Sequence, residues 1–429
     1  MSRLVLFGRS VVVPGSKPLS NVFIEIEDGL VAKLTSFGRD PDISADVILP
    51  GIIDAHVHCR DWGQSRKETL ATASAAAVAG GIVQVHDMPN TDPPILLESD
   101  VERRLSDAEK AGMKARYKVY VGITEDAGQV GAAAECASKN PGVAGLKLFA
   151  GDSFGSLGIT DPRKQARVYG RLARSGYSGV LMVHCEKLSE FAQKAFDEAH
   201  PESWSEIRPA QSETESVKDQ ISAAAKAGFR GHLHICHVTL PETVRIVSAA
   251  PSKLRVSCGV TPHHLLLSTE QMATMKSGSL LKVNPPLREK RHSDMLIRKL
   301  GDGGIAWLES DHAPHCLEEK LSLPFASGVP ELDTYSGFVT SLYQGYGMPW
   351  QRIAEVTSQN AARVFGLGPR SISPGSVADL TLIDMKPSDV RKESLRTKCG
   401  WSPYEGMAFP GRCKATVISG NVAYASEEH

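Results

Sequence analysis

The chain of 429 residues lacks an apolar run approaching the ~20 residues that a membrane-spanning helix needs. Residues 1–5 lack the apolar stretch and cleavage site of a signal peptide. The chain also lacks a charge excess, because 48 Lys and Arg stand against 49 Asp and Glu and give a net charge of −1. We therefore expect a cytoplasmic protein whose main partner is neither nucleic acid nor a membrane.

Disulfide and dinucleotide-binding patterns are missing as well. The eight cysteines are scattered without a CxxC pair, which indicates free thiols in a reducing compartment. Three of them adjoin candidate site histidines, and we interpret them as small apolar filler: Cys59, Cys185 and Cys236. No GxGxxG motif opens a helix, so a dinucleotide-binding fold has no support, and we find no internal repeat or low-complexity tract.

What the middle of the chain does contain is a regular alternation of apolar strand-like runs with helical stretches. The expected strands are 82–85, 115–121, 143–149, 180–184, 232–237, 254–258 and 305–311. The expected helices are 65–78, 99–111, 126–138, 162–175, 188–199, 213–227 and 241–250. This alternation predicts an α/β fold, and about eight units fit a closed (β/α)8 TIM-type barrel better than an open sheet.

Both ends of the chain have strand character without helices. Residues 23–27 alternate apolar and polar side chains, and Asp28-Gly29 supplies a hairpin turn after them. Strand patterns return after about residue 366. We predict three parts: residues 1–50 and 366–429, which pair into one small β-sandwich, and a catalytic barrel over residues 51–365.

The stretch 50–60 organises the chemistry, because it carries the pattern Asp54-x-His56-x-His58. Side chains alternate along a strand, so these three point the same way. Two imidazoles at a strand end can chelate a metal ion such as Zn²⁺, and Asp54 could support them as a hydrogen-bond acceptor or help to shape the strand. On this stretch alone, a half-buried strand with incidental histidines is the alternative.

Polar residues recur at the ends of other predicted strands. Lys147 interrupts an apolar run, His184 and His237 end two more, and Asp311 ends the last. A lysine is usually exposed, but one buried as a cation is costly and needs a partner or a chemical change. A neutral lysine amine can take up CO₂ to give a carbamate that bridges two metals. With histidines and an aspartate, such a site suits the hydrolysis of amides.

In combination, these motifs resemble the amidohydrolase superfamily and, within it, the dihydroorotases. The motifs that carry the resemblance are Asp54–Arg60, Asp87–Thr91, Gly145–Phe149, Val183–Glu186, His234–Val238, Thr261–Leu265, Val283–Leu287 and Ser310–His315. The resemblance implies reversible cyclisation of N-carbamoyl-L-aspartate to (S)-dihydroorotate in de novo pyrimidine (UMP) biosynthesis.

The resemblance also implies two zinc ions per subunit. His56, His58, carbamylated Lys147 and Asp311 would bind one zinc, and Lys147, His184 and His237 would bind the other. Asp311 would serve as the catalytic proton carrier. The expected substrate-binding residues are His58, Arg60, Asn90, Ser153, Phe154, Asn284, His315, Ser327 and Gly328.

Three positions depart from the family pattern. Trp62 stands where the family usually has a proline, and we expect it to reshape the mouth near the carboxylate site. Gly259 stands where the animal enzyme has a glutamate tied to a third metal, so a third metal is not expected. His86 occupies a position where a small or apolar residue is common, and the sequence suggests no role for it.

Other functions stay open at this point. A hydantoinase- or allantoinase-type cyclic amidase would share the metal ligands but not the carboxylate-binding set. An inactive homologue that scaffolds aspartate transcarbamoylase should have lost metal ligands, whereas every candidate ligand is present. A homodimer and an association with aspartate transcarbamoylase are compatible with the sequence, which does not decide them.

Overall fold

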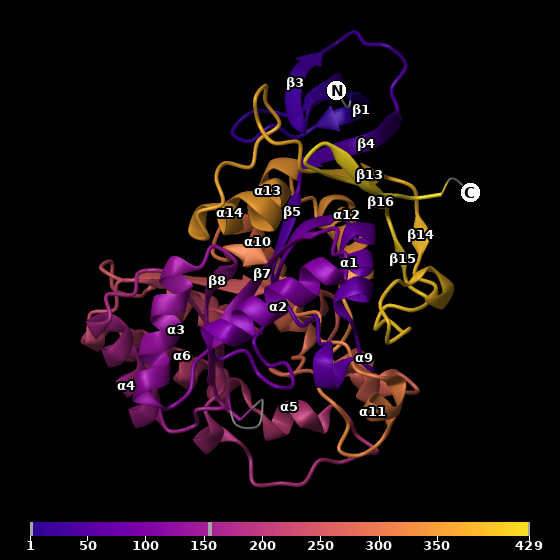
Figure 1. The fold of residues 1–429 in the computed structure, drawn as a ribbon. Coiled ribbons are helices and arrows are strands. Elements are labelled where there is room, and N and C mark those ends of the chain that lie inside the picture. The colour runs from indigo at the N-terminus through magenta and orange to yellow at the C-terminus, as the bar shows by residue number, and fades with distance from the viewer. Residues whose placement is uncertain (1–2, 153–156, 428–429) are drawn as a thin grey trace.

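Eight parallel strands form a barrel in the computed structural model, which describes residues 3–152 and 157–427 (Figure 1). They are β5 (Ile52–Val57), β6 (Ile82–Asp87), β7 (Arg116–Gly122), β8 (Val143–Ala150), β9 (Val180–Cys185), β10 (His232–Ile235), β11 (Arg255–Val260) and β12 (Trp307–Leu308). Each strand pairs with the next in chain order. A parallel bridge from Val57 to His312, with the His58 N–H donating to the His312 carbonyl at 2.8 Å, joins the first strand to the segment after the last. The predicted barrel is confirmed.

Helices surround this barrel on the outside (Figure 1). They are α1 (Leu70–Ala79), α2 (Glu98–Lys110), α3 (Ala127–Lys139), α4 (Pro162–Arg174), α5 (Ser203–Ile207), α6 (Ala210–Ala227), α7 (Pro241–Ser248), α8 (Pro262–Leu266), α9 (Thr269–Thr274), α10 (Lys290–Asp302), α11 (Leu317–Leu321), α12 (Tyr335–Gln344), α13 (Trp350–Ala354) and α14 (Asn360–Val364). Within residues 3–152 and 157–427, none of the helices has the length and apolar character to cross a membrane.

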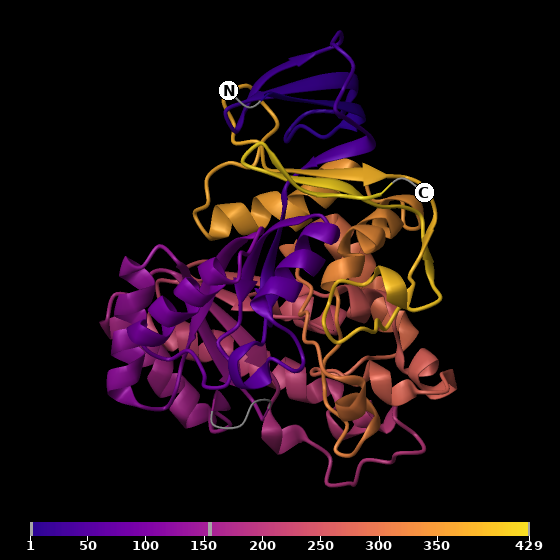
Figure 2. The ribbon, with the colours of Figure 1, turned by 45° about the vertical axis from the view of Figure 1, so that its right-hand side comes forward.

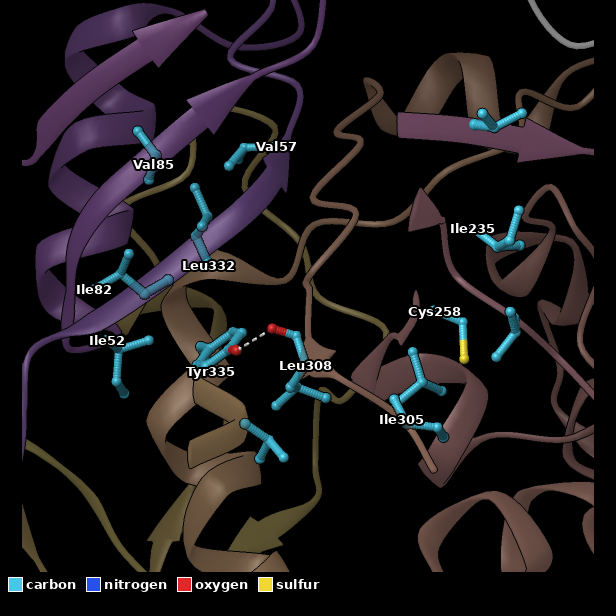
Figure 3. Close-up of a cluster of buried hydrophobic side chains, with 14 of the residues drawn as sticks. Ile52, Val57, Ile82, Val85, Ile235, Cys258, Ile305, Leu308, Leu332 and Tyr335 are labelled. Carbon is cyan, nitrogen blue, oxygen red and sulfur yellow. Dashed lines mark hydrogen bonds between the residues drawn. The ribbon is translucent and has the colours of Figure 1, made fainter. Parts of the chain in front are cut away.

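The core between strands and helices fixes the ends of the strands. Figure 3 shows Ile52, Val57, Ile82 and Val85 of the first two barrel strands packed beside Leu332 in this core. The Tyr335 hydroxyl of α12 donates to the Leu308 carbonyl at 2.9 Å (Figure 3). This bond ties the end of β12, and therefore the residues that follow it, to the helical layer.

A separate seven-stranded sheet contains both ends of the chain. Its strands are β1 (Arg3–Val11), β2 (Leu19–Glu27), β3 (Leu30–Thr35), β4 (Ile43–Pro50), β13 (Leu380–Asp384), β16 (Arg412–Ile418) and β17 (Asn421–Ala425), and β14 (Ser388–Asp389) pairs with β15 (Ala408–Phe409) beside it. Figure 2 shows the N-terminal strands above the C-terminal ones. One apolar cluster draws from both groups of strands, which confirms that the two ends pair into one β unit with its own core.

The predicted helix over residues 188–199 is wrong, because only Leu188–Glu190 forms a short 3-10 turn. Aromatic contacts hold the rest as a loop. Phe191 lies under the Arg208 guanidinium at 4.5 Å, and the Phe196 ring packs on Trp204 at 5.8 Å between centroids. These tertiary contacts outweigh the modest helix propensity of the segment.

Two strands and one helix are shorter than the sequence predicts. The strands expected over 232–237 and 305–311 end at Ile235 and Leu308, and His237 and Asp311 beyond them have φ of 38° and 47°. A left-handed residue cannot continue a strand. The helix expected from residue 65 begins only at Leu70, because Thr69 caps its first turn.

Candidate metal centre and active site

Four histidines and one aspartate meet at the carboxyl end of the barrel, and we call them the histidine cluster: His56, His58, His184, His237 and Asp311. His56 Nε2 and His58 Nε2 lie 3.3 Å and 2.9 Å from the same oxygen, Asp311 Oδ1. His184 Nδ1 lies 3.2 Å from His237 Nε2. The two halves adjoin, because the His56 and His237 ring centroids are 5.2 Å apart. The predicted ligands from four different strands are therefore brought together.

Lys147 lines the same pocket as the histidine cluster and is 0% exposed. Its Nζ is 3.2 Å from Cys236 Sγ, and no carboxylate of the described residues lies within 4.0 Å of it. A lysine buried without an anionic partner among the described residues fits the expectation that its amine is paired or chemically changed. The filler interpretation suits Cys59 and Cys185, which belong to the apolar core, but it is incomplete for Cys236 because that thiol contacts Lys147.

Burial keeps the imidazoles of the cluster uncharged. Loss of solvent lowers the pKa of His56 to about 4, with the nearby Lys147 as a second cause. Burial also lowers the pKa values of His58, His184 and His237. Neutral imidazole is the form that binds a metal ion, so the cluster is ready for metal at neutral pH.

The donor set suits a divalent metal cation. The outer nitrogens of two histidines are tied: His58 Nδ1 is 2.7 Å from Asn90 Oδ1, and His184 Nε2 is 3.0 Å from Glu186 Oε2. That leaves the inner nitrogens of these rings directed at Asp311 and His237. Ligands fixed through their outer nitrogen are typical of protein metal sites. The ligand atoms of His56, His58 and Asp311 all lie within 4.8 Å of one another.

Three buried carboxylates support the cluster, and sequence reasoning named a role for only one of them. Asp54 accepts the backbone N–H groups of His56 and Ser310 at 3.2 Å and 3.1 Å, which fits the expectation that it helps to shape the strand. Glu186 accepts from Arg208 at 2.6 Å while it contacts His184. The predictions from the sequence gave Glu309 no role. It could have been identified by the pattern that singled out Lys147, a charged residue inside an apolar run.

A second group of predicted residues, the carboxylate corner, consists of Arg60, Asn90 and His315. Arg60 is 2% exposed, and its Nη2 lies 3.3 Å from His315 Nε2. Burial lowers the pKa of Arg60 to about 10, so it stays charged at pH 7. Among the described residues no carboxylate lies within 4.0 Å of Arg60, and the amide Nδ2 of Asn90 is buried without a hydrogen-bond partner. The corner therefore presents unused donors to an anion.

The remaining predicted residues form a ring wall, which we define as Asn284, Ser327 and Gly328. They line one narrow pocket together with Lys147 and the histidine cluster. Gly328 has φ of 138°, and a Cβ there would lie 2.5 Å from the Ala313 carbonyl oxygen, so glycine is required. The carboxylate corner lies beside this cavity and connects to it through the contact of Asn90 with His58. Ser153 and Phe154 lie outside the described residues.

The structure shows the contacts of Trp62 and His86, two residues that depart from the family pattern. The Trp62 indole donates to Asp107 of α2 at 2.9 Å, and its ring lies 5.0 Å from the Arg104 guanidinium. His86 is fully buried, 2.9 Å from Gln84 Nε2, and packs edge-on against Phe365 with 4.6 Å between ring centroids. Trp62 therefore belongs to the support of the mouth, and His86 to the packed interior of the barrel.

Comparisons with known proteins agree with this geometry. The profile of the amidohydrolase family matches residues 47–161. The solved L-hydantoinase (dihydropyrimidinase) from Arthrobacter aurescens is 23% identical, covers 99% of this chain and 97% of its own, and superposes with a TM-score of 0.86. The solved dihydropyrimidinase from Brevibacillus agri is 22% identical, covers 99% of this chain and 95% of its own, and superposes with a TM-score of 0.86. These solved structures show that the fold is shared with cyclic amide hydrolases, and the profile match assigns residues 47–161 to the amidohydrolase family.

The curated relatives narrow this class. The dihydroorotase from Thermococcus kodakarensis is 34% identical over 100% of this chain and 96% of its own length. The dihydroorotase from Halobacterium salinarum is 33% identical over 89% of this chain and 88% of its own length. The chain belongs to the dihydroorotase family.

Proposed function

We propose that this enzyme interconverts N-carbamoyl-L-aspartate and (S)-dihydroorotate by closing or opening a cyclic amide, the step that forms the ring in pyrimidine synthesis. The observation that carries this proposal is the buried Arg60, which has no carboxylate partner among the described residues and lies next to a metal-type cluster. Both compounds carry a carboxylate that such a guanidinium can hold through paired hydrogen bonds. A hydantoin has no carboxylate and would leave Arg60 without a partner.

The cofactor in this proposal is a pair of zinc ions. His56, His58, Lys147 and Asp311 would hold one ion, and Lys147, His184 and His237 the other. Lys147 would be carbamylated: its neutral amine adds to CO₂, a C–N bond forms and one proton is released. When bound, zinc supplies a Lewis acid that polarises the amide carbonyl and lowers the pKa of water.

The chain itself would perform the remaining tasks. Asp311, with Oδ1 facing two imidazoles, is placed to accept a proton from water and to pass it to the ring nitrogen when the ring opens. Arg60 and Asn90 Nδ2 would hold the carboxylate, and the ring wall would hold the pyrimidine ring. We extend the proposal to Ser153 and Phe154 as substrate contacts on the sequence pattern alone.

Location and assembly complete the proposal. All eight cysteines are free, which fits a reducing cytoplasm. We propose a cytoplasmic enzyme and a homodimer, with association to aspartate transcarbamoylase as the further possibility. Light scattering of the purified protein, alone and mixed with that transcarbamoylase, tests both assemblies.

Replacing Arg60 with Met tests the proposed substrate, with Arg60→Lys as the charge-retaining control. Loss of a buried charged partner costs about 2–5 kcal/mol, so kcat/KM for dihydroorotate should fall about 30- to 4000-fold, and less in the lysine variant. Zinc content should stay at the wild-type level. Full activity on dihydroorotate in the Met variant, with strong hydantoin cleavage by the wild type, would show a hydantoinase-type enzyme instead.

A further inference from the structure

Glu309 is a buried carboxylate that touches both halves of the histidine cluster. It follows β12 directly and has 0% exposure. Its Oε1 accepts the His237 N–H at 2.5 Å and lies 3.7 Å from His56 Nδ1. Its Oε2 accepts from Trp307 Nε1 at 3.0 Å and lies 3.3 Å from His234 Nε2. A single side chain therefore reaches a predicted ligand from each half.

The glycine at position 259 makes room for this carboxylate. Gly259 lies in β11, in strand conformation, opposite Trp307 of β12. A Cβ on Gly259 would stand 2.6 Å from Glu309 Cδ and 2.8 Å from each carboxylate oxygen. Glycine is needed here because of the neighbouring side chain and not because of the backbone. The space beside residue 259 is therefore occupied by a carboxylate supplied from the next strand.

His56 requires an acceptor on the side where Glu309 lies. Its Nε2 is directed at Asp311, so a metal bound at Nε2 leaves the ring proton on Nδ1. That Nδ1 is buried and has no hydrogen-bond partner among the described residues. Over the same residues, Glu309 is the carboxylate within 4.0 Å of Nδ1. Metal-binding histidines generally donate their second N–H to such a group.

We propose that Glu309 is a positioning residue for the metal centre: it holds the Nδ1–H form of His56 and the backbone of His237, and Gly259 is glycine to admit it. This inference rests on the metal site of the proposed function. It adds a link between the two halves of the cluster that is independent of Lys147. It also predicts that positions 259 and 309 are energetically coupled, because each side chain limits the space of the other.

The test measures metal binding rather than turnover. Metal-loaded wild type, Glu309→Gln, Glu309→Ala, Gly259→Ala and the double variant are titrated with a chelator, and zinc release is followed. The Ala variant should bind zinc about 10- to 100-fold more weakly, and the Gln variant, which keeps an acceptor oxygen, should lose less. Cobalt-substituted protein should show shifted d–d absorption bands in the Ala variant. Glu331→Gln, which changes a buried glutamate on His263, is the matched control and should leave zinc affinity unchanged.

Coupling gives the sharper criterion. Gly259→Ala alone should weaken zinc binding, yet adding it to Glu309→Ala should cost nothing more. Wild-type zinc affinity and cobalt bands in a folded Glu309→Ala protein would overturn the inference, as would additive effects at the two positions. A third zinc ion lost with Glu309 would also overturn it, since the carboxylate would then be a ligand. If Glu309→Ala does not fold, the zinc affinities of Glu309→Gln and Gly259→Ala test the inference, and wild-type affinity in both would overturn it. Native protein without any metal would instead refute the proposed function.

Discussion

The histidine cluster and the ring wall face one cavity, yet the chain holds them in different ways. The cluster is built from side chains at strand ends, and buried carboxylates such as Glu186 and Glu309 orient its rings. The ring wall is built from loops, and hydrogen bonds to main-chain carbonyls hold it. Three of these bonds come from one lysine, Lys320. Changes in the cluster should therefore affect kcat, and changes behind the wall should affect KM.

The largest effect is expected from Asp311→Asn. This change removes the proposed proton acceptor and a charged neighbour of two imidazoles, while the side-chain size is kept. General acid–base groups contribute about 10²–10⁴-fold, so kcat should fall at least ~10³-fold. KM for dihydroorotate should change less than fivefold, which steady-state kinetics of the zinc-loaded protein would measure.

Asp333→Asn is the matched control, since that carboxylate accepts backbone N–H groups of Arg396 and Thr397 outside the cluster. It should keep kcat near the wild-type value. A kcat above one tenth of wild type in Asp311→Asn would show that Asp311 does not carry the proton in catalysis. The view that the histidine cluster controls kcat would then lose its main argument.

The barrel and the convergence of the candidate ligands were predictable because both follow from local spacing. The strand runs around Lys147 and His184 are apolar, continuous and almost completely buried, which is typical of a parallel barrel. Since parallel strands end at one edge, polar residues at their ends had to meet. Glu309 was predictable by the same reasoning as Lys147. The domain boundaries at residues 50 and 366 stay predictions.

What escaped prediction depends on contacts between distant parts of the sequence. Nothing near Phe191 indicates that Arg208 will pack on it and prevent a helix. The left-handed turns at His237 and Asp311 are likewise set by the surroundings of the cluster, and they end two strands early. Lys320 resembles any lysine of a surface helix in the sequence, although the fold buries it completely. Tertiary packing, which a single sequence does not display, decides each of these cases.

Arg104→Lys should produce the next largest effect, and it acts on the carboxylate corner. Arg104 binds Asp87 through Nε at 3.1 Å and Nη2 at 2.7 Å, and the same Nη2 donates to the Arg60 carbonyl at 2.9 Å. That bond holds Arg60 at φ of 52°, a strained conformation. A lysine cannot make this forked set. We expect KM for dihydroorotate to rise about 30-fold with kcat nearly constant.

Arg103→Lys is the control for this change, because Arg103 is the adjacent residue of the same helix and is exposed. It should leave KM within twofold of wild type. An unchanged KM in Arg104→Lys, at wild-type thermal stability, would mean that Arg60 keeps its position without this support.

Lys320→Met should have a smaller effect and act on the ring wall. The Lys320 ammonium donates to the carbonyls of Lys282, Ala326 and Gly328 at 2.9, 2.9 and 3.0 Å, so it joins the two segments that carry the wall. Methionine fills the space but leaves three acceptors without a donor. KM for dihydroorotate should rise about tenfold, with zinc content and kcat within threefold of wild type.

Lys290→Met, on an exposed lysine of α10, is the control and should change neither constant. If Lys320→Met lowered kcat and zinc content together, the wall and the cluster would not be separate units, and the contrast drawn here would fail.

The smallest effect on turnover is expected from His86→Gln, which probes the barrel interior below both regions. Burial lowers the pKa of His86 from 6.5 to about 3. Below pH 6.5 the unfolded chain therefore binds a proton at this site and the folded chain does not, so stability is lost as pH falls from 6.5 towards 3. The slope is about 1.4 kcal/mol per pH unit for one proton.

Glutamine at position 86 cannot take up this proton. In urea unfolding between pH 6.5 and 5.0, the free energy of unfolding of His86→Gln should therefore fall less steeply than that of wild type, by up to about 1.4 kcal/mol per pH unit. Its kcat should stay within twofold of wild type. His200→Gln, at an exposed position, should keep the wild-type slope. Equal slopes in wild type and His86→Gln would mean that His86 is protonated in the folded barrel, and the interior would then carry a charge that reaches the cluster above it.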